Sequence, residues 1–291
     1  MTVTATRTGR WGQERRLEFI DFRLLWEGKV NRSDLTHFFG ISVPQASLDF
    51  SAYQGLAPEN MSYDRTLKAY VAGPNFKPVL TNPDPGHYLN ELLQRGIGNI
   101  APTDSFIGGA PPVASLPTPT RQVDQQILIS LIRAIQAGEA VEVDYRSMTN
   151  FDAPGVRAIF PTSFAHDGFR WHTRAFCFKS EKFKDFVLGR INALYASFTA
   201  PAEVPPDVEW ETFIDVIIGP NPSYPHEKRK AIEHDYQMVN GEARLRAREP
   251  QLYYLKRRLN LNERPEDPVT EHQQIVMLRI ERVLKESAGD D

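Results

Sequence analysis

The chain has 291 residues, 41% of them hydrophobic, and a formal net charge of −3. This length predicts two or three domains, each able to bury a core. The slightly acidic balance excludes a protein coated evenly in basic charge, so any binding of nucleic acid has to rest on local patches.

Three further features indicate a reducing cytoplasm. There is no apolar run long enough to span a membrane, and the N-terminus lacks the apolar segment of a secretory signal. A lone cysteine, Cys177, excludes an intrachain disulfide and a cysteine-based zinc site. It falls on the apolar face of its predicted strand, so we interpret it as a buried structural thiol. We expect no metal and no cofactor.

The N-terminal region predicts helices over residues 12–27, 32–39 and 43–53. Asn31 and Ser42 are good N-caps for the second and third helices, and a short turn containing Gly40 separates the two. Two short helices joined by such a turn are typical of a helix-turn-helix.

Strands are predicted over residues 66–72 and 76–80, with Gly73-Pro74-Asn75 as their turn. A hairpin in this position is a wing, and the third helix is then the recognition helix. Its early residues are expected to face base edges, with Gln45 as the best reader of adenine: Ser42, Val43, Gln45, Ala46, Ser47 and Asp49. The expected phosphate contacts are Arg32, Lys68, Tyr70 and Lys77. The Asp49 charge is unfavourable beside DNA.

Residues 88–95 predict one more helix, and residues 101–119 are rich in Gly and Pro. We interpret the second stretch as an extended linker, or alternatively as a strap packed on a neighbouring domain. The predicted division is an N-terminal domain at 1–85, a helix and linker at 86–120, a middle domain at 121–200 and a C-terminal domain at 201–291.

The middle domain predicts a helix from Val123 to Gly138 and strands over residues 141–145, 156–161, 169–178 and 186–191. This order favours a small barrel-like sheet. The period of two places His172 and Arg174 on one face of the third strand. With Arg190 they form a candidate seat for an anionic ligand, because guanidinium groups match phosphate geometry. The alternative is a solvated strand face.

The C-terminal domain predicts a strand at 213–218, a helix at 226–237, a strand at 242–249 and helices at 251–259 and 268–287. This order suggests a small two-layer α/β module. Arg244, Arg246 and Arg248 alternate along the second strand, which is usually the sign of a solvated face.

The run FRWHTRAF at 169–176, followed by FVLGRI at 186–191, resembles the WYL-domain family of bacterial regulators. Trp171 matches the first letter of the naming triplet, whereas His172 and Thr173 replace the other two. This departure, and the layout of the whole chain, resemble the BrxR and CapW type. The resemblance implies a multidomain α+β protein with a winged helix-turn-helix, a central Sm/SH3-like WYL β-barrel and a small α/β dimerisation domain.

The resemblance also implies a function. It indicates a homodimeric transcriptional repressor of a bacterial anti-phage defence operon, of the BREX or CBASS type, that binds an inverted-repeat operator. The WYL domain would sense a nucleotide or nucleic acid, at Tyr145, Ser147, His172, Arg174 and Arg190. The arginine strand at 244–248 would then meet ligand bound to the partner subunit.

Two alternatives remain. The winged helix could bind a protein, because a fold does not fix a function. An enzyme acting on nucleotides would use His172, Asp185 and Arg190, but the sequence has no paired-carboxylate motif, metal-ligand spacing, phosphate loop or nucleophile elbow. We therefore expect that the protein is not an enzyme.

Overall fold

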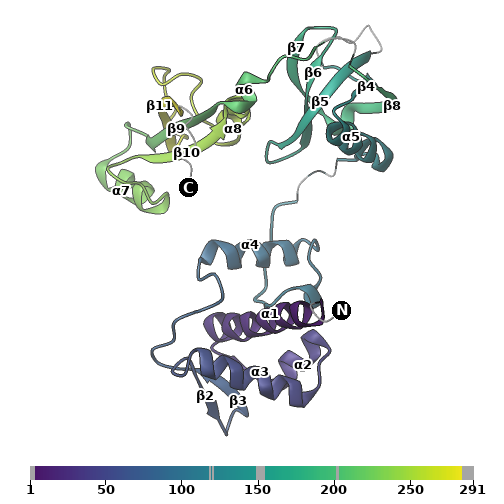
Figure 1. Ribbon diagram of the computed structural model, residues 1–291. Coiled ribbons are helices and arrows are strands. Elements are labelled where there is room, and N and C mark those ends of the chain that lie inside the picture. Colours follow the sequence, from purple (N-terminus) through teal and green to yellow (C-terminus); the bar gives the residue numbers. More distant parts are fainter. Residues whose placement is uncertain (1–3, 118, 120, 149–154, 201–202, 284–291) are drawn as a thin grey trace, which may run out of the picture. The chain divides into compact units, whose positions relative to one another are not determined.

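The computed structural model describes residues 4–117, 119, 121–148, 155–200 and 203–283, with side chains from residue 12 onward. The chain divides into two compact units, residues 1–117 and 118–291 (Figure 1). None of the described helices is long and apolar enough to cross a membrane.

The N-terminal unit is built on helices whose starts are set by local caps. These are α1 (Thr4–Glu27), α2 (Arg32–Phe39), α3 (Val43–Leu56) and α4 (Pro85–Gly96), followed by a short 3-10 turn, η1 (Pro102–Asp104). The Asn31 side chain accepts from the Asp34 amide, and the Asp34 carboxylate accepts from the Asn31 amide. Ser42 accepts from the Gln45 amide at 3.3 Å. The predicted starts of α2 and α3 are therefore confirmed, each by its own cap.

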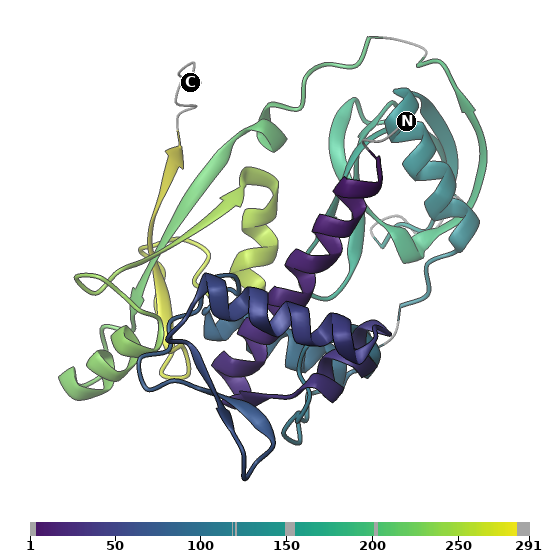
Figure 2. The same cartoon turned by 60° about the horizontal axis from the view of Figure 1, so that its bottom comes forward.

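A three-stranded antiparallel sheet completes this unit in the order β1-β3-β2. Its strands are β1 (Lys29–Val30), β2 (Met61–Asp64) and β3 (Ala69–Ala72). Figure 2 shows the β2–β3 hairpin, in blue, extending away from the helices of its unit. The predicted hairpin was misplaced, because residues 76–80 are not a strand. The amides of Val79, Leu80 and Thr81 instead donate to the buried Asp21 carboxylate.

The stretch after α4 belongs to the core of the N-terminal unit. Phe106 and Ile107 are 5% and 2% exposed, and the Phe106 ring meets that of Phe19 edge-on. The Gly108 amide donates to Glu27 on α1. Full burial of a side chain such as Phe106 stabilises a fold by roughly 1.5–3 kcal/mol. This part of the predicted linker is therefore packed as a strap, which was the alternative interpretation.

The second unit begins with α5 (Gln125–Ala137) and an antiparallel sheet in the order β7-β6-β5-β4-β8. The strands are β4 (Ala140–Tyr145), β5 (Val156–His166), β6 (Trp171–Cys177), β7 (Lys182–Val187) and β8 (Ile191–Phe198). The predicted strand at 186–191 was misplaced, because only its first two residues belong to β7, which ends at Val187. A 3-10 turn, η2 (Leu188–Arg190), follows, and most of β8 was missed. Within the described residues β7 and β8 are the sheet edges, so the sheet is open where a closed barrel was expected. Cys177 is buried in its core as predicted.

The C-terminal part of this unit forms a second antiparallel sheet, in the order β10-β9-β11, with helices beside it. Its elements are α6 (Val208–Glu211), β9 (Phe213–Pro220), α7 (His226–Asp235), β10 (Ala243–Arg248), η3 (Glu249–Gln251), α8 (Leu252–Arg258) and β11 (Ile275–Val283). The predicted final helix at 268–287 was wrong, because residues 275–283 pair with β9. A short apolar run is compatible with a helix or a strand. Here the hydrogen bonds with β9 make it a strand. Residues 284–287 of that prediction lie outside the described residues.

Candidate functional site

The expected reading face is the start of α3, and it is only partly exposed. Ser42 and Val43 are exposed, and Gln45 and Ser47 are half-buried. Ala46 is 0% exposed and lies in the core. The expectation that Ala46 faces base edges was therefore wrong, because the helical period turns this position inward.

Asp49 was also expected on the reading face, and it is buried as well. Arg16 of α1 donates to its carboxylate twice, from Nε at 2.6 Å and from Nη2 at 3.2 Å. The side-chain amide of Gln45 donates from Nε2 to the same carboxylate at 3.2 Å. The Asp49 charge is compensated inside the unit, so it does not oppose DNA as the sequence suggested.

The predicted phosphate contacts fall into two groups. Lys68 and Lys77 are exposed, and Lys68 lies in the β2–β3 turn with φ of 52°. Arg32 donates to the Tyr70 hydroxyl at 2.8 Å, and the Tyr70 ring stacks on Phe50 with centroids 4.3 Å apart. Arg32 and Tyr70 therefore join α2 to the hairpin, which leaves them less free to meet a phosphate.

Sequence reasoning missed Arg65 at the tip of the hairpin. Arg65 is exposed, and no ion pair engages it among the described residues. The Asp64 carboxylate accepts from the amides of Thr66 and Leu67, which closes the turn beneath it. Aspartate favours turns because its side chain can accept from amides two and three residues further on. Asp64 was therefore a turn signal that is visible in the sequence.

The predicted ligand residues of the second unit do not meet in one place. Tyr145, Ser147 and Arg190 line one depression beside β7. It also holds cations that the sequence did not single out: Arg157, Lys179 and Lys184. The Tyr145 hydroxyl accepts from the Val187 amide at 3.2 Å. This depression is basic overall, with Asp185 as its acidic member.

Arg174 lies elsewhere and is saturated with carboxylates. It is 4% exposed, and it donates to Asp207 from Nε at 2.7 Å and from Nη2 at 2.9 Å. Glu209 and Asp185 also lie within ion-pair distance of it. Burial acts to lower the pKa of Arg174, but these carboxylates outweigh it and raise the pKa. The predicted role of Arg174 in holding phosphate conflicts with this geometry, because four of its five N–H groups already donate to carboxylates.

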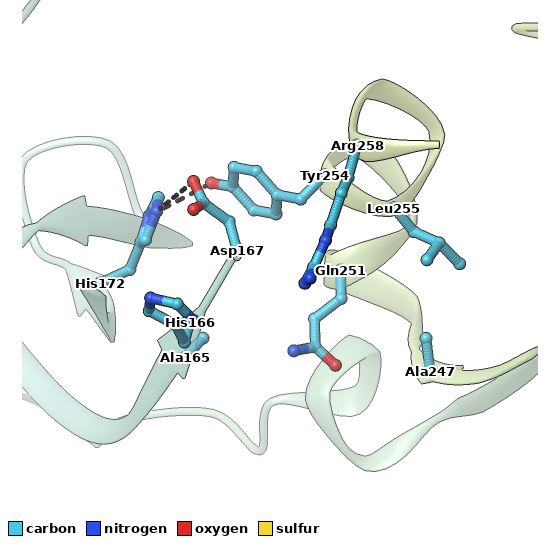
Figure 3. A pocket seen from close by; sticks show the side chains of 9 residues that line it. All are labelled: Ala165, His166, Asp167, His172, Ala247, Gln251, Tyr254, Leu255 and Arg258. Carbon is cyan, nitrogen blue, oxygen red and sulfur yellow. Dashed lines mark hydrogen bonds and ion pairs between the residues drawn. The ribbon is translucent and has the colours of Figure 1, made fainter. Parts of the chain in front are cut away.

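His172 faces α8 in a small cavity rather than the depression around Arg190 (Figure 3). Its Nε2 lies 3.0 Å from an Asp167 oxygen, and its Nδ1 lies 3.4 Å from the Tyr254 hydroxyl. That hydroxyl donates to Asp185 at 3.2 Å. Burial lowers the pKa of His172, and Asp167 opposes the shift only in part.

Asp167 is ionised despite its partial burial, because several hydrogen bonds stabilise its carboxylate. Burial acts to raise the pKa of Asp167, but the amides of Phe169 and Arg170 and the His172 ring outweigh it and lower the pKa to about 2. These hydrogen bonds of Asp167 fix the turn between β5 and β6. Through His172 and Tyr254 they also connect the turn to α8.

The residues considered for catalysis do not converge. His172 and Asp185 both contact the Tyr254 hydroxyl, whereas Arg190 lines the other depression. Over the described part of the chain, no group of three or more His, Cys, Asp or Glu side chains is placed to hold a metal ion.

The arginine row on β10 is not simply solvated. Arg244 and Arg246 both donate to Asp215 of β9, which is 1% exposed. Hydrogen bonds from Arg246, then from Arg244, lower the pKa of Asp215 to about 2. Arg248 lies over the rings of Trp210 and Phe213. The row therefore holds β10 against β9 and α6.

Three known families match successive parts of the chain. Residues 12–94 match the BrxR transcriptional regulator winged helix-turn-helix domain. Residues 126–195 match the WYL domain, and residues 213–283 match the BrxR transcriptional regulator C-terminal dimerization domain. Two of the three are domains of a transcriptional regulator, in agreement with the expectation that the protein is not an enzyme.

Characterised relatives match over most of their length. DNA-binding transcriptional repressor CapW of Escherichia coli is 46% identical over 257 residues, which cover 87% of this chain and 85% of that protein. CapW of Pseudomonas aeruginosa is 41% identical over 279 residues, covering 96% and 92%. CapW of Stenotrophomonas maltophilia is 39% identical over 277 residues, covering 94% and 92%.

Among solved structures, proteasome accessory factor B/C (PafBC) of Arthrobacter aurescens aligns with 83% of this chain and 42% of its own at 15% identity and a TM-score of 0.30, which is too distant to support an argument. The relatives are close and nearly full-length. The chain belongs to the CapW family of transcriptional repressors.

Proposed function

We propose that this chain is a homodimeric DNA-binding repressor of an anti-phage defence operon, of the BREX or CBASS type. It binds an inverted-repeat operator, since a two-fold dimer reads a pseudo-palindrome. The observation that carries the proposal is the winged helix, in which the exposed start of α3 stands in the same unit as a hairpin tipped by Arg65 and Lys68.

The two elements have different tasks in this proposal. Ser42, Val43, Gln45 and Ser47 of α3 meet base edges, and Val43, 60% exposed, suits a thymine methyl group. Arg65 and Lys68 at the hairpin tip, with Lys77, meet phosphates. Phosphate contacts fix the position of the protein, and base contacts specify the sequence.

The WYL region is the proposed sensor. A nucleotide or a piece of nucleic acid binds the depression around Tyr145, Ser147 and Arg190, where Arg157 and Lys184 add positive charge. The β7-β6-β5-β4-β8 order is compatible with an Sm/SH3-like curl of the sheet. Ligand binding shifts the population of dimers able to hold DNA.

The first test is a mobility-shift titration with the DNA upstream of the gene, repeated across a salt series. A discrete complex that resists non-specific competitor is expected, and footprinting should show a protected inverted repeat. Its affinity should fall as salt rises, since phosphate contacts release counterions. Loss of the complex on adding competitor would contradict the proposal.

Two substitutions distinguish contacts with bases, which specify the sequence, from contacts with phosphates, which position the protein. Lys68→Ala should weaken all duplexes alike and reduce the salt slope by about one, whereas Gln45→Ala should cost about 1–3 kcal/mol on the operator alone. Lys230→Ala on α7 is the matched control, because it removes an exposed lysine from the other unit.

A second candidate function is protein binding by the winged helix. Its support is apolar exposure, with Leu48 at 64%, Leu67 at 56% and Leu56 at 53%. If Gln45→Ala and Lys68→Ala both leave DNA affinity unchanged, while Leu48→Asp removes a protein partner in a pull-down, the adaptor function is favoured instead.

A further inference from the structure

A second depression in the C-terminal unit gathers arginines and aromatic rings from separate segments. Arg121 precedes α5, Phe169 and Arg170 belong to the β5–β6 turn, and Tyr253, Arg257 and Arg258 belong to α8. It shares Asp167, Tyr254 and Arg258 with the cavity of Figure 3, so the two adjoin each other. Its volume of about 450 Å³ falls within the roughly 300–1,000 Å³ of small-ligand sites.

The charge of this depression is unbalanced. Four arginines face one carboxylate, Asp167, which leaves a net charge of +3. Asp167 is engaged by Arg170 and His172, both at 3.0 Å. No carboxylate pairs with Arg121, Arg257 or Arg258 among the described residues. Three guanidinium groups therefore keep donors for a ligand.

A structural explanation covers only part of the cluster. Arg257 and Arg258 lie in the last turn of α8, where positive charge is favourable at a helix C-terminus. Arg170 pairs with Asp167 inside its own turn, but neither explanation reaches Arg121, which precedes α5. These local roles also do not account for the gathering of four arginines from three segments around one depression.

The β5–β6 turn also leaves room for a guanidinium group. Gly168 has φ of 95°, and a Cβ added there would lie 2.6 Å from Nη1 of Arg258. Any other residue would be strained and would push the arginine away. Arg258 therefore lies directly over the backbone of the turn, between α8 and the WYL sheet.

Aromatic rings remain open beside these charges. Phe169 is 61% exposed and Tyr253 is 51% exposed. Arginine beside exposed rings is the chemistry that binds nucleotides, with guanidinium groups on phosphates and rings stacked on bases. A single phosphate monoester carries about −1.5 to −2 at neutral pH, so a charge of +3 suits two or more phosphates.

We propose that this depression binds a nucleotide carrying two or more phosphate groups, either free or within a single strand. The site is separate from the depression around Arg190. A ligand here contacts both the WYL region and α8, and this contact is how it would influence the C-terminal domain. Only that regulatory consequence rests on the proposed function, whereas the binding itself does not.

Fluorescence anisotropy of the full chain with labelled single-stranded oligothymidylate tests the site, with ATP and inorganic tripolyphosphate as competitors. The double variant R257A/R258A should lose about tenfold or more in affinity for the probe. Arg133→Ala, an exposed arginine on α5, is the control and should bind normally. Repeating the pair in an R65A/K68A background removes the contribution of the winged helix.

Tyr253→Ala distinguishes a nucleotide from any polyanion. It should weaken oligothymidylate and ATP while leaving tripolyphosphate unchanged, because only the first two carry a base. Competition by ATP would assign a free nucleotide, and binding of the oligomer alone would assign a single strand. Thermal unfolding of each variant, together with R257K/R258K, separates loss of binding from loss of folding.

Normal oligothymidylate binding by R257A/R258A overturns the site. So does a failure of the unsubstituted protein to bind oligothymidylate, ATP or tripolyphosphate, with the two competitors also measured directly by calorimetry. If Tyr253→Ala weakens the binding of oligothymidylate, ATP and tripolyphosphate equally, the assignment of a nucleotide is overturned. Operator binding by the same preparations is scored separately. A protein that shifts its operator but binds none of the probes refutes this inference and leaves the proposed repressor intact.

Discussion

Arg174 and Arg190 lie close together in sequence, yet their surroundings give them opposite tasks. Arg174 is buried and holds Asp207 in a two-pronged pair, with Asp185 at 3.5 Å. Arg190 is partly exposed and lines a basic depression. The first is a structural tie between β6 and the segment that leads into β9. The second keeps donors for a ligand.

Arg174→Ala should therefore unfold the second unit more readily. It leaves Asp207 and Asp185, at 9% and 12% side-chain exposure, without a compensating positive charge from Arg174, and breaking a buried pair costs about 3–5 kcal/mol. Arg190→Ala should change the free energy of unfolding by less than about 0.5 kcal/mol. Urea denaturation measures both. Equal stability of the two variants would contradict this division.

His172 makes the stability of the unit depend on pH. Burial lowers the pKa of His172 below its ordinary value, so the folded protein binds fewer protons than the unfolded chain as pH falls below about 6.5. The free energy of unfolding should therefore decrease from pH 7 toward the lowered pKa. Asp167, Asp185, Tyr254 and Arg170 are the polar groups facing the ring.

Thermal unfolding from pH 7 to pH 5 tests this dependence. His172→Gln should flatten the slope even if it lowers stability at every pH. His226→Gln, at an exposed position on α7, should keep the slope. An unchanged slope in His172→Gln would assign the dependence to other groups.

Among the elements, β11 depends on a close approach to β9. The register shifts between Met277 and Arg279, which leaves Leu278 as the irregular residue. A Cβ added at Gly219 would lie 2.8 Å from the Leu278 side chain and 3.0 Å from the Gly241 carbonyl oxygen. Gly219→Ala should destabilise the C-terminal sheet by roughly 1–3 kcal/mol. Leu278→Ala in the same chain should recover part of that loss, which a double-mutant cycle by denaturation would measure.

The elements that sequence reasoning placed well are those with local signals. The starts of α2 and α3 depend on Asn31 and Ser42, whose partners lie within three residues. The wing was misplaced because Asp21 captures the amides of residues 79–81 from about sixty positions away. The final strand was taken for a helix because only its pairing with β9 separates the two.

The candidate site shows the same difference between local signals, which the sequence reveals, and contacts between distant segments, which it does not. Alternation correctly placed His172 and Arg174 on one face of β6, but it could not show what covers that face. Asp207 reaches Arg174 from thirty-three residues further along, and Tyr254 reaches His172 from eighty-two. Charges that look available in a sequence can thus be neutralised by distant segments. Conversely, Arg121 and Arg258 come together only in the folded chain.

At the scale of the whole molecule, two binding functions share one chain, and linkage relates them. If a nucleotide at the arginine cluster changes operator affinity by some factor, operator DNA must change nucleotide affinity by the same factor. Couplings of this kind are typically about 5–150-fold. A single-stranded ligand that competes with operator DNA for the winged helix behaves differently. It lowers the apparent operator affinity further with every increase in its concentration, without a plateau.

Operator titrations at rising concentrations of ATP or oligothymidylate distinguish the two cases. Coupling predicts that the apparent operator affinity levels off once the arginine cluster is saturated, and that R257A/R258A abolishes the effect while still binding operator. The reverse titration, of probe in the presence of saturating operator, should give the same factor. A decline without a plateau, unchanged in R257A/R258A but removed by R65A/K68A, would show competition at the hairpin. The cluster would then have no part in regulation.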